Sequence, residues 1–248
     1  MASVLNVSAY LFTRIADPGA LRLVLRDRAE AADLRGTILL AEEGINLFLA
    51  SDAARVRGFV DALRADERFA ALQTKESWSD AVPFGRMLVK VKREIIRMDR
   101  PDVRPQDGRA PAVSPQTLRR WLERGSDDHG REVVLVDTRN AFEVDHGTFA
   151  GARDWRIERF TQFPAAADAH RDELAGKAVV SFCTGGIRCE KAALYLRDGG
   201  VDAYQLDGGI LGWFAAEGDA HWSGDCFVFD GREALDPDLT ARPASLGA

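Results

Sequence analysis

Apolar and polar residues alternate in blocks along the first third of the chain, and the blocks predict strands and helices in turn. Residues 5–12 are mostly apolar and predict a strand. Apolar residues over 16–33 recur at three- and four-residue steps, which is typical of an amphipathic helix. Asp17 followed by Pro18 suits the start of that helix, as an N-cap and a first helical position.

The next segment predicts a hairpin, a second helix and a last strand. Two short apolar runs, 37–41 and 45–50, flank a tight Glu-Glu-Gly turn. A helix capped at 51–52 follows, and 87–96 alternates apolar with basic residues as a final strand. The resulting β-α-β-β-α-β order predicts a ferredoxin-like α/β domain over residues 1–98.

The second half of the chain predicts an α/β domain with a parallel sheet. Prolines recur through 99–115, which indicates an extended linker because proline disfavours helix. Beyond it, continuous apolar runs are typical of buried parallel strands, and they alternate with helical segments. We expect this domain to occupy 116–222 and a tail to follow over 223–248. The apolar runs are 133–136, 179–182 and 203–206.

One loop in the second half combines features that favour chemistry. An apolar strand delivers Cys183 to a loop with two glycines and Arg188, and a helix follows directly. Glycines permit a nest of inward-facing N–H groups, the helix adds its positive end, and arginine adds a fixed charge. These features stabilise a thiolate, so the sequence predicts a depressed pKa for Cys183. A lone cysteine is more often a buried structural residue, but the coincidence of all these features favours a nucleophile.

This segment resembles the active loop of the rhodanese family, in which a cysteine, four residues and an arginine form the cradle. Here Thr184, Gly185, Gly186 and Ile187 separate Cys183 from Arg188. Related phosphatases use five intervening residues, so the spacing argues against a phosphatase. The resemblance also implies supporting roles for Asp137 and Arg139. It extends to 206–213, and Thr148 stands where many rhodaneses carry histidine.

Motifs along nearly the whole chain resemble a narrower family, the tRNA uridine hydroxylases. The resemblance implies oxygen-dependent hydroxylation of carbon 5 of the wobble uridine, position 34, with Cys183 essential. It also implies the tRNA anticodon loop as partner, molecular oxygen as co-substrate and no recognised cofactor. The motifs are 40–46, 83–86, 89–96, 137–140, 183–192 and 224–230.

The composition narrows the class of protein and its expected location. The 248 residues carry a net charge of −6 and are 46% hydrophobic, an ordinary globular composition. We expect a cytoplasmic protein with no membrane partner, because no secretory signal or bilayer-length apolar run is visible. The three cysteines and four histidines show no zinc spacing, and the chain lacks the Cys-x-x-Cys pairs of some family members. We therefore expect no structural metal.

A local basic stretch is the candidate contact with tRNA phosphates. The alternative is an ordinary solvated strand face, and the family resemblance favours RNA. Four aromatic residues are candidate stacking platforms or core residues, with no ground for choosing: Trp78, Phe84, Trp155 and Phe160. The candidate phosphate contacts are Lys75, Arg86, Lys90, Lys92, Arg93 and Arg97.

Several alternatives stay open at this point. Cys183 could add to carbon 6 of uracil, or carry oxygen as an oxidised sulfur. The cradle fits a sulfurtransferase equally well, with a persulfide on Cys183, and a tRNA-binding module with an unused loop is a third possibility. Cys189 could resolve an oxidised Cys183 or simply pack beneath the loop. Glu190 and Lys191 are candidate supporting residues.

Overall fold

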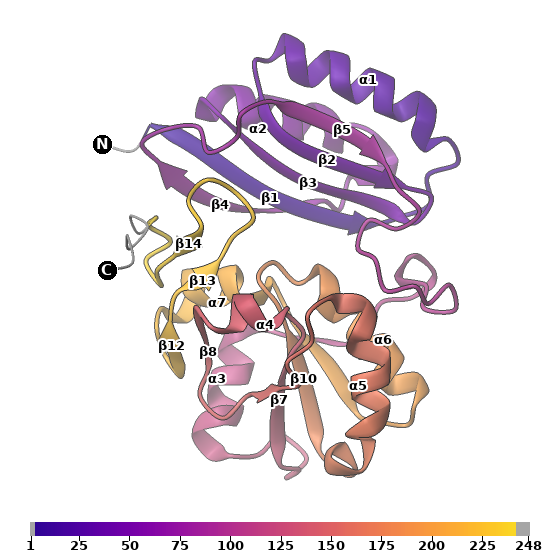
Figure 1. Ribbon diagram of the computed structural model, residues 1–248, viewed down its shortest axis with the longest axis vertical. Coiled ribbons are helices and arrows are strands. Elements are labelled where there is room, and N and C mark those ends of the chain that lie inside the picture. Colours follow the sequence, from indigo (N-terminus) through magenta and orange to yellow (C-terminus); the bar gives the residue numbers. More distant parts are fainter. Residues whose placement is uncertain (1–2, 242–248) are drawn as a thin grey trace. The chain divides into compact units, whose positions relative to one another are not determined.

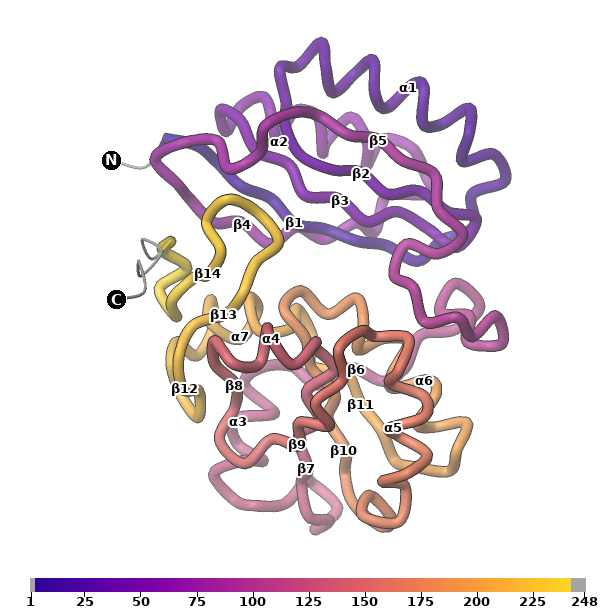
Figure 2. The backbone as a smooth tube through the Cα atoms, viewed as in Figure 1, coloured from indigo at the N-terminus to yellow at the C-terminus, as the bar shows by residue number. Residues whose placement is uncertain are grey.

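The computed structural model describes residues 3–241 and divides the chain into two compact units. The first unit contains the chain up to Arg97 together with Phe229–Glu233. The second contains Met98–Val228 and Ala234–Leu239. Figures 1 and 2 show a mixed sheet with two helices in the first unit, and a parallel sheet between helices in the second.

The first unit is a five-stranded sheet with both helices on one face (Figure 1). Alternate residues of the strands pack against these helices and form its core, as the period of a half-buried strand requires. Asp17 caps the first helix by accepting a hydrogen bond from the Ala20 N–H at 2.8 Å. The elements are β1 (Val4–Phe12), α1 (Pro18–Ala31), β2 (Arg35–Ala41), β3 (Gly44–Ser51), α2 (Ala53–Arg64), β4 (Gln73–Ser79) and β5 (Met87–Val91).

The predicted ferredoxin-like order is confirmed. A strand is present where the last one was predicted, but it covers Met87–Val91 instead of 87–96 and is not the fourth strand of that order. The fourth strand is β4, which pairs with β1, whereas β5 is an added strand at the opposite edge and runs parallel to β2. Sequence reasoning missed β4 because this edge strand is mainly polar and lacks apolar alternation. Backbone pairing with β1, rather than side-chain burial, defines it.

The second unit has a parallel sheet of order β6-β11-β10-β7-β9. Its first strand lies inside the predicted linker 99–115, so the end of that stretch belongs to the sheet. The strands are β6 (Ala112–Val113), β7 (Val133–Asp137), β9 (Arg153–Asp154), β10 (Ala178–Phe182) and β11 (Ala203–Leu206). The helices are α3 (Pro115–Arg124), α4 (Ala141–Val144), α5 (Phe163–Ala169), α6 (Ile187–Asp198) and α7 (Gly209–Glu217).

Two short antiparallel pairs complete the second unit. β8 (Gly147–Phe149) pairs with β12 (Trp222–Gly224), and β13 (Cys226–Phe227) pairs with β14 (Ala234–Leu235). None of the helices in residues 3–241 is long and apolar enough to cross a membrane. The predicted tail 223–248 contains β13 and β14, and its residues 242–248 lie outside the described part of the chain.

Candidate active site

The loop from Cys183 to Arg188 joins the carboxyl end of β10 to α6, the central strand-to-helix connection of the second unit. α6 begins at Ile187, earlier than the sequence predicted, so its positive end lies within the loop. Gly186 has φ +98°, a conformation that favours glycine, and its N–H donates to the Cys183 Sγ at 3.2 Å. The Cys183 side chain is buried, at 1% exposure.

This environment makes Cys183 a thiolate at neutral pH. Burial opposes the charge and raises the pKa, but a hydrogen bond from Cys189, the positive charge of Arg188 and backbone N–H groups outweigh it. The net effect lowers the pKa of Cys183 to about 5. Cys189 shows the opposite behaviour, because burial and the neighbouring Cys183 thiolate raise its pKa well above the ordinary value.

Arg188 is held by a residue that sequence reasoning did not select, Glu143. The two guanidinium nitrogens of Arg188 donate to the two carboxylate oxygens of Glu143 at 2.6 and 2.7 Å. Both side chains are buried, with exposures of 7% and 0%. A bidentate pair fixes the plane of the guanidinium, and with it the end of the loop. The available signal was the position of Glu143 three residues after Asn140, a capping pattern.

The predicted pair Asp137 and Arg139 forms a second buried ion pair that supports the first. Its nitrogen and oxygen atoms approach to 2.6 Å, and both side chains are fully buried. Arg139 also donates to the backbone oxygen of Glu143 at 3.3 Å. The hydroxyl of Thr148 donates to Asp137 at 2.9 Å, which gives a role to the residue where this chain departs from many rhodaneses. Asp137 and Arg139 therefore position Glu143, and through it Arg188.

The start of α7 holds the other side of the loop. The N–H of Ile210 donates to the Cys183 carbonyl at 2.9 Å, and the N–H of Leu211 donates to the Thr184 carbonyl at 3.0 Å. These bonds occupy the loop carbonyls, while the loop N–H of Gly186 donates to the Cys183 sulfur. Gly209 permits the contact, since a Cβ there would lie 2.5 Å from the Cys183 oxygen.

The remaining predicted supporting residues are buried beneath the loop. Glu190 accepts from the Arg109 guanidinium at 2.7 and 3.1 Å. Lys191 is 1% exposed on the same helix. Cys226 lies in β13, and burial raises the pKa of its thiol to about 12. Cys183 is therefore the only cysteine of the chain whose environment favours the thiolate near neutral pH.

The predicted phosphate contacts do not all lie on one part of the first unit. Arg86, Lys90, Lys92 and Arg93 lie on β5 or within two residues of its ends, at one edge of the sheet. Arg97 lies six residues beyond β5, and Lys75 lies on β4 at the other edge. Lys75 Nζ is 4.8 Å from the centroid of the Tyr10 ring. Glu43 accepts from the Ile95 N–H at 2.7 Å and so positions the basic segment. The exposed basic residues among these are Arg86, Lys90, Lys92, Arg93 and Arg97.

The candidate stacking residues are placed differently from one another. Phe160 is buried against Phe163, and Trp155 stacks on the His170 ring at 5.3 Å between centroids. Trp78 is 41% exposed on β4. Trp155 and Phe160 therefore pack within the second unit.

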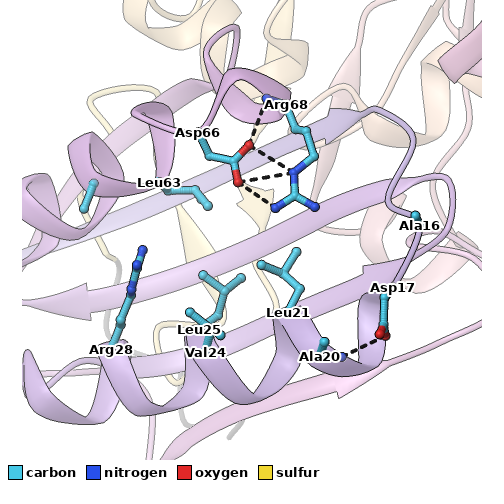
Figure 3. Close-up of a pocket in the computed structure, with 11 residues that line it drawn as sticks. Ala16, Asp17, Ala20, Leu21, Val24, Leu25, Arg28, Leu63, Asp66 and Arg68 are labelled. Atoms are coloured by element: carbon cyan, nitrogen blue, oxygen red, sulfur yellow. Dashed lines mark hydrogen bonds and ion pairs between the residues drawn. The ribbon is translucent and has the colours of Figure 1, made fainter.

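A cavity of about 380 Å³ lies in the first unit, between α1 and the segment after α2 (Figure 3). Leu21, Val24, Arg28 and the Asp66–Arg68 ion pair line it, and no residue of the Cys183 loop does. Within residues 3–241, no group of three or more His, Cys, Asp or Glu side chains is arranged to hold a metal ion.

Alkylation of Cys183 by iodoacetamide tests the thiolate directly. Only the thiolate reacts, so the rate rises with pH through the pKa, with a midpoint near pH 5 and a plateau by pH 7. Peptide mass spectrometry separates Cys183 from the two other cysteines. A midpoint near 8.5, the value of an ordinary thiol, contradicts the geometry.

Glu143→Gln tests the buried pair. It leaves the Arg188 charge buried with a neutral partner, and we expect a loss of about 3–5 kcal/mol in the free energy of unfolding, measured by urea denaturation. Glu123→Gln removes the exposed partner of Arg119 in the same unit and is the control, with an expected loss below about 1 kcal/mol. Equal losses of unfolding free energy in the two variants mean that the buried pair contributes no more to stability than the exposed pair.

Gly209→Ala tests the contact between α7 and the loop. The added Cβ meets backbone atoms of Cys183 and Gly186 at 2.5 and 2.6 Å, so we expect slower Cys183 alkylation at pH 7 and a lower melting temperature. Gly125→Ala is the control, because Gly125 also has positive φ but faces open space. It should cost about 1 kcal/mol and leave alkylation unchanged. Unchanged alkylation in Gly209→Ala shows that α7 does not shape the loop.

Comparison with known proteins places this geometry in a family. The UPF0176 acylphosphatase-like domain matches residues 4–95, and the rhodanese-like domain matches 114–216. Relatives from Variovorax paradoxus and Delftia acidovorans are each 62% identical, over 100% and 98% of this chain and 95% and 93% of their own. A relative from Bordetella petrii is 62% identical over 98% of this chain and 97% of its own. All three are named tRNA uridine(34) hydroxylase, and the chain belongs to this family.

Proposed function

We propose that this protein is an oxidoreductase that hydroxylates carbon 5 of uridine 34 in tRNA, with Cys183 as nucleophile and molecular oxygen as co-substrate. The name shared by its close relatives supports the reaction. The observation that carries the role of Cys183 is its position in a loop fixed by Arg188 and α7, where the Gly186 N–H donates to its sulfur. A tRNA substrate is consistent with a cytoplasmic location.

The thiolate has a defined task in this reaction. Addition of Cys183 Sγ to carbon 6 breaks the carbon 5–carbon 6 double bond and places an electron pair on carbon 5. The electron pair on carbon 5 then bonds to dioxygen, and uptake of a proton gives a hydroperoxide at carbon 5. Two electrons from the external donor and two protons cleave its O–O bond, which leaves the hydroxyl on carbon 5 and releases water. Loss of the carbon 5 proton and departure of the thiolate restore the double bond. Overall, uridine, dioxygen, two protons and two electrons from an external donor give 5-hydroxyuridine and water.

The basic segment of the first unit supplies the contact with the RNA backbone in this proposal. Lys90 and Lys92 alternate with apolar residues on β5 and its continuation, and the Lys92 N–H still bonds to the Leu40 oxygen at 2.8 Å. Val89 packs into the core beneath the helices, so the lysines face away from them. Cations in such a row bind successive phosphates without reading sequence. Lys75 lies on β4, the edge strand opposite β5, and so does not belong to this row.

Sulfur transfer is the second candidate. The Gly186 N–H that bonds to the Cys183 Sγ and the nearby Arg188 would also stabilise the anionic outer sulfur of a persulfide. The two reactions differ in their product, so nucleoside analysis separates them.

Nucleoside mass spectrometry of tRNA tests the proposed function. Cells that lack this protein and any redundant route to the same nucleoside are complemented with wild type, Cys183→Ser or Cys226→Ala. We expect wild type and the Cys226 variant to restore 5-hydroxyuridine and its derivatives, and Cys183→Ser to restore none. Persistence of these nucleosides without the protein contradicts the proposal, and loss of a thiolated nucleoside instead supports sulfur transfer.

A further inference from the structure

Three aromatic rings gather beside the catalytic loop in the second unit. The Phe142 and Phe227 rings meet edge to face with centroids 5.1 Å apart, and the His146 ring lies 5.3 Å from that of Phe227. Phe142 is 45% exposed, and His146 is also exposed. We call these three residues the Phe142 cluster. None of them was among the stacking residues selected from the sequence.

The Phe142 cluster is attached to the loop at two points. The short helix α4 turns Glu143 inward to Arg188 and leaves the adjacent Phe142 ring exposed. On the other side, the Thr184 hydroxyl donates to the Phe227 backbone oxygen at 3.3 Å. Glu143, which binds Arg188, is therefore the neighbour of Phe142, and Thr184 of the loop binds the backbone of Phe227.

Aromatic rings at this position suit a flat, unpaired base. A single exposed phenylalanine is ordinary on a protein surface. Here the exposed ring is supported edge to face by a second ring and neighbours the residue that fixes the loop arginine. Proteins that act on bases of single-stranded RNA loops stack the splayed base on such rings.

We propose that Phe142, supported by Phe227, is the stacking platform that holds the uracil of residue 34 at the Cys183 loop. This inference rests on the proposed function and adds the substrate-binding ring to it. Stacking recognises a flat base without distinguishing uracil from others, so Phe142 provides position and affinity rather than base identity.

A double-mutant cycle tests the platform, with the Phe142 ring varied in the protein and the base at position 34 varied in the RNA. Anticodon stem-loop RNA with uridine at position 34, or with an abasic residue there, is bound to the full chain carrying Cys183→Ser, which prevents turnover. With Phe142 present, uridine should bind about 5- to 150-fold more tightly than the abasic RNA. Phe142→Ala and Phe142→Leu should bring this ratio close to one, and Phe142→Tyr should retain it.

Trp78, on β4 of the first unit, is the exposed rival among the candidate stacking residues, and Trp78→Ala should leave the ratio unchanged. A ratio near one with Phe142 present, a ratio retained in Phe142→Leu, or a ratio lost only in Trp78→Ala overturns the platform. Product formation by the chain with Cys183 intact, measured on the same uridine RNA, reports the proposed function separately. Turnover that continues while the ratio is unaffected by Phe142 therefore contradicts the platform alone.

Discussion

The buried ion pair between Arg188 and Glu143 is the interaction on which the site depends. Two charges removed from water are tolerated only when the geometry is good and the remaining hydrogen-bonding groups are satisfied. Both conditions hold, because the pair is bidentate and Arg139 bonds the Glu143 backbone from behind. The strand end at Asp137, the helix α4 and the loop from Cys183 to Arg188 are thereby joined in one network, in which each ion pair positions the next.

That network explains how a buried cysteine can carry a negative charge. Burial alone raises the pKa of a thiol, as it does at Cys189 and Cys226. Cys183 differs because a hydrogen bond from Cys189, the charge of Arg188 and the backbone N–H groups at the start of α6 together outweigh the effect of burial on its pKa. α7 contributes indirectly, since its first N–H groups bind the loop carbonyls and leave the loop donors directed inward. At Cys189 and Cys226, in contrast, burial outweighs the neighbours that lower the pKa.

The sequence pattern predicts the features that depend on local rules. It misses the features that depend on tertiary contacts. The β-α-β-β-α-β order, the cap at Asp17 and the loop from Cys183 to Arg188 follow from periodicity, capping chemistry and glycine content. β4 escaped because it is polar, and β6 because it is two residues long within a proline-rich stretch. The partners of Glu143 and Thr148, which are Arg188 and Asp137, were not predicted, because they depend on which segments become neighbours in the fold and spacing along the chain does not reveal this.

The central claim is that the Cys183 thiolate attacks the uracil ring. An anticodon stem-loop with 5-fluorouridine at position 34 tests it most directly, because fluorine cannot leave carbon 5 as a proton does. If Cys183 adds to carbon 6 and carbon 5 is then hydroxylated, the thiolate cannot be expelled by proton loss. We expect a stable protein–RNA adduct under turnover conditions, mapped to Cys183 by mass spectrometry and absent in Cys183→Ser. Hydroxylation of ordinary uridine by the same preparation with no adduct on the fluorinated RNA would contradict it.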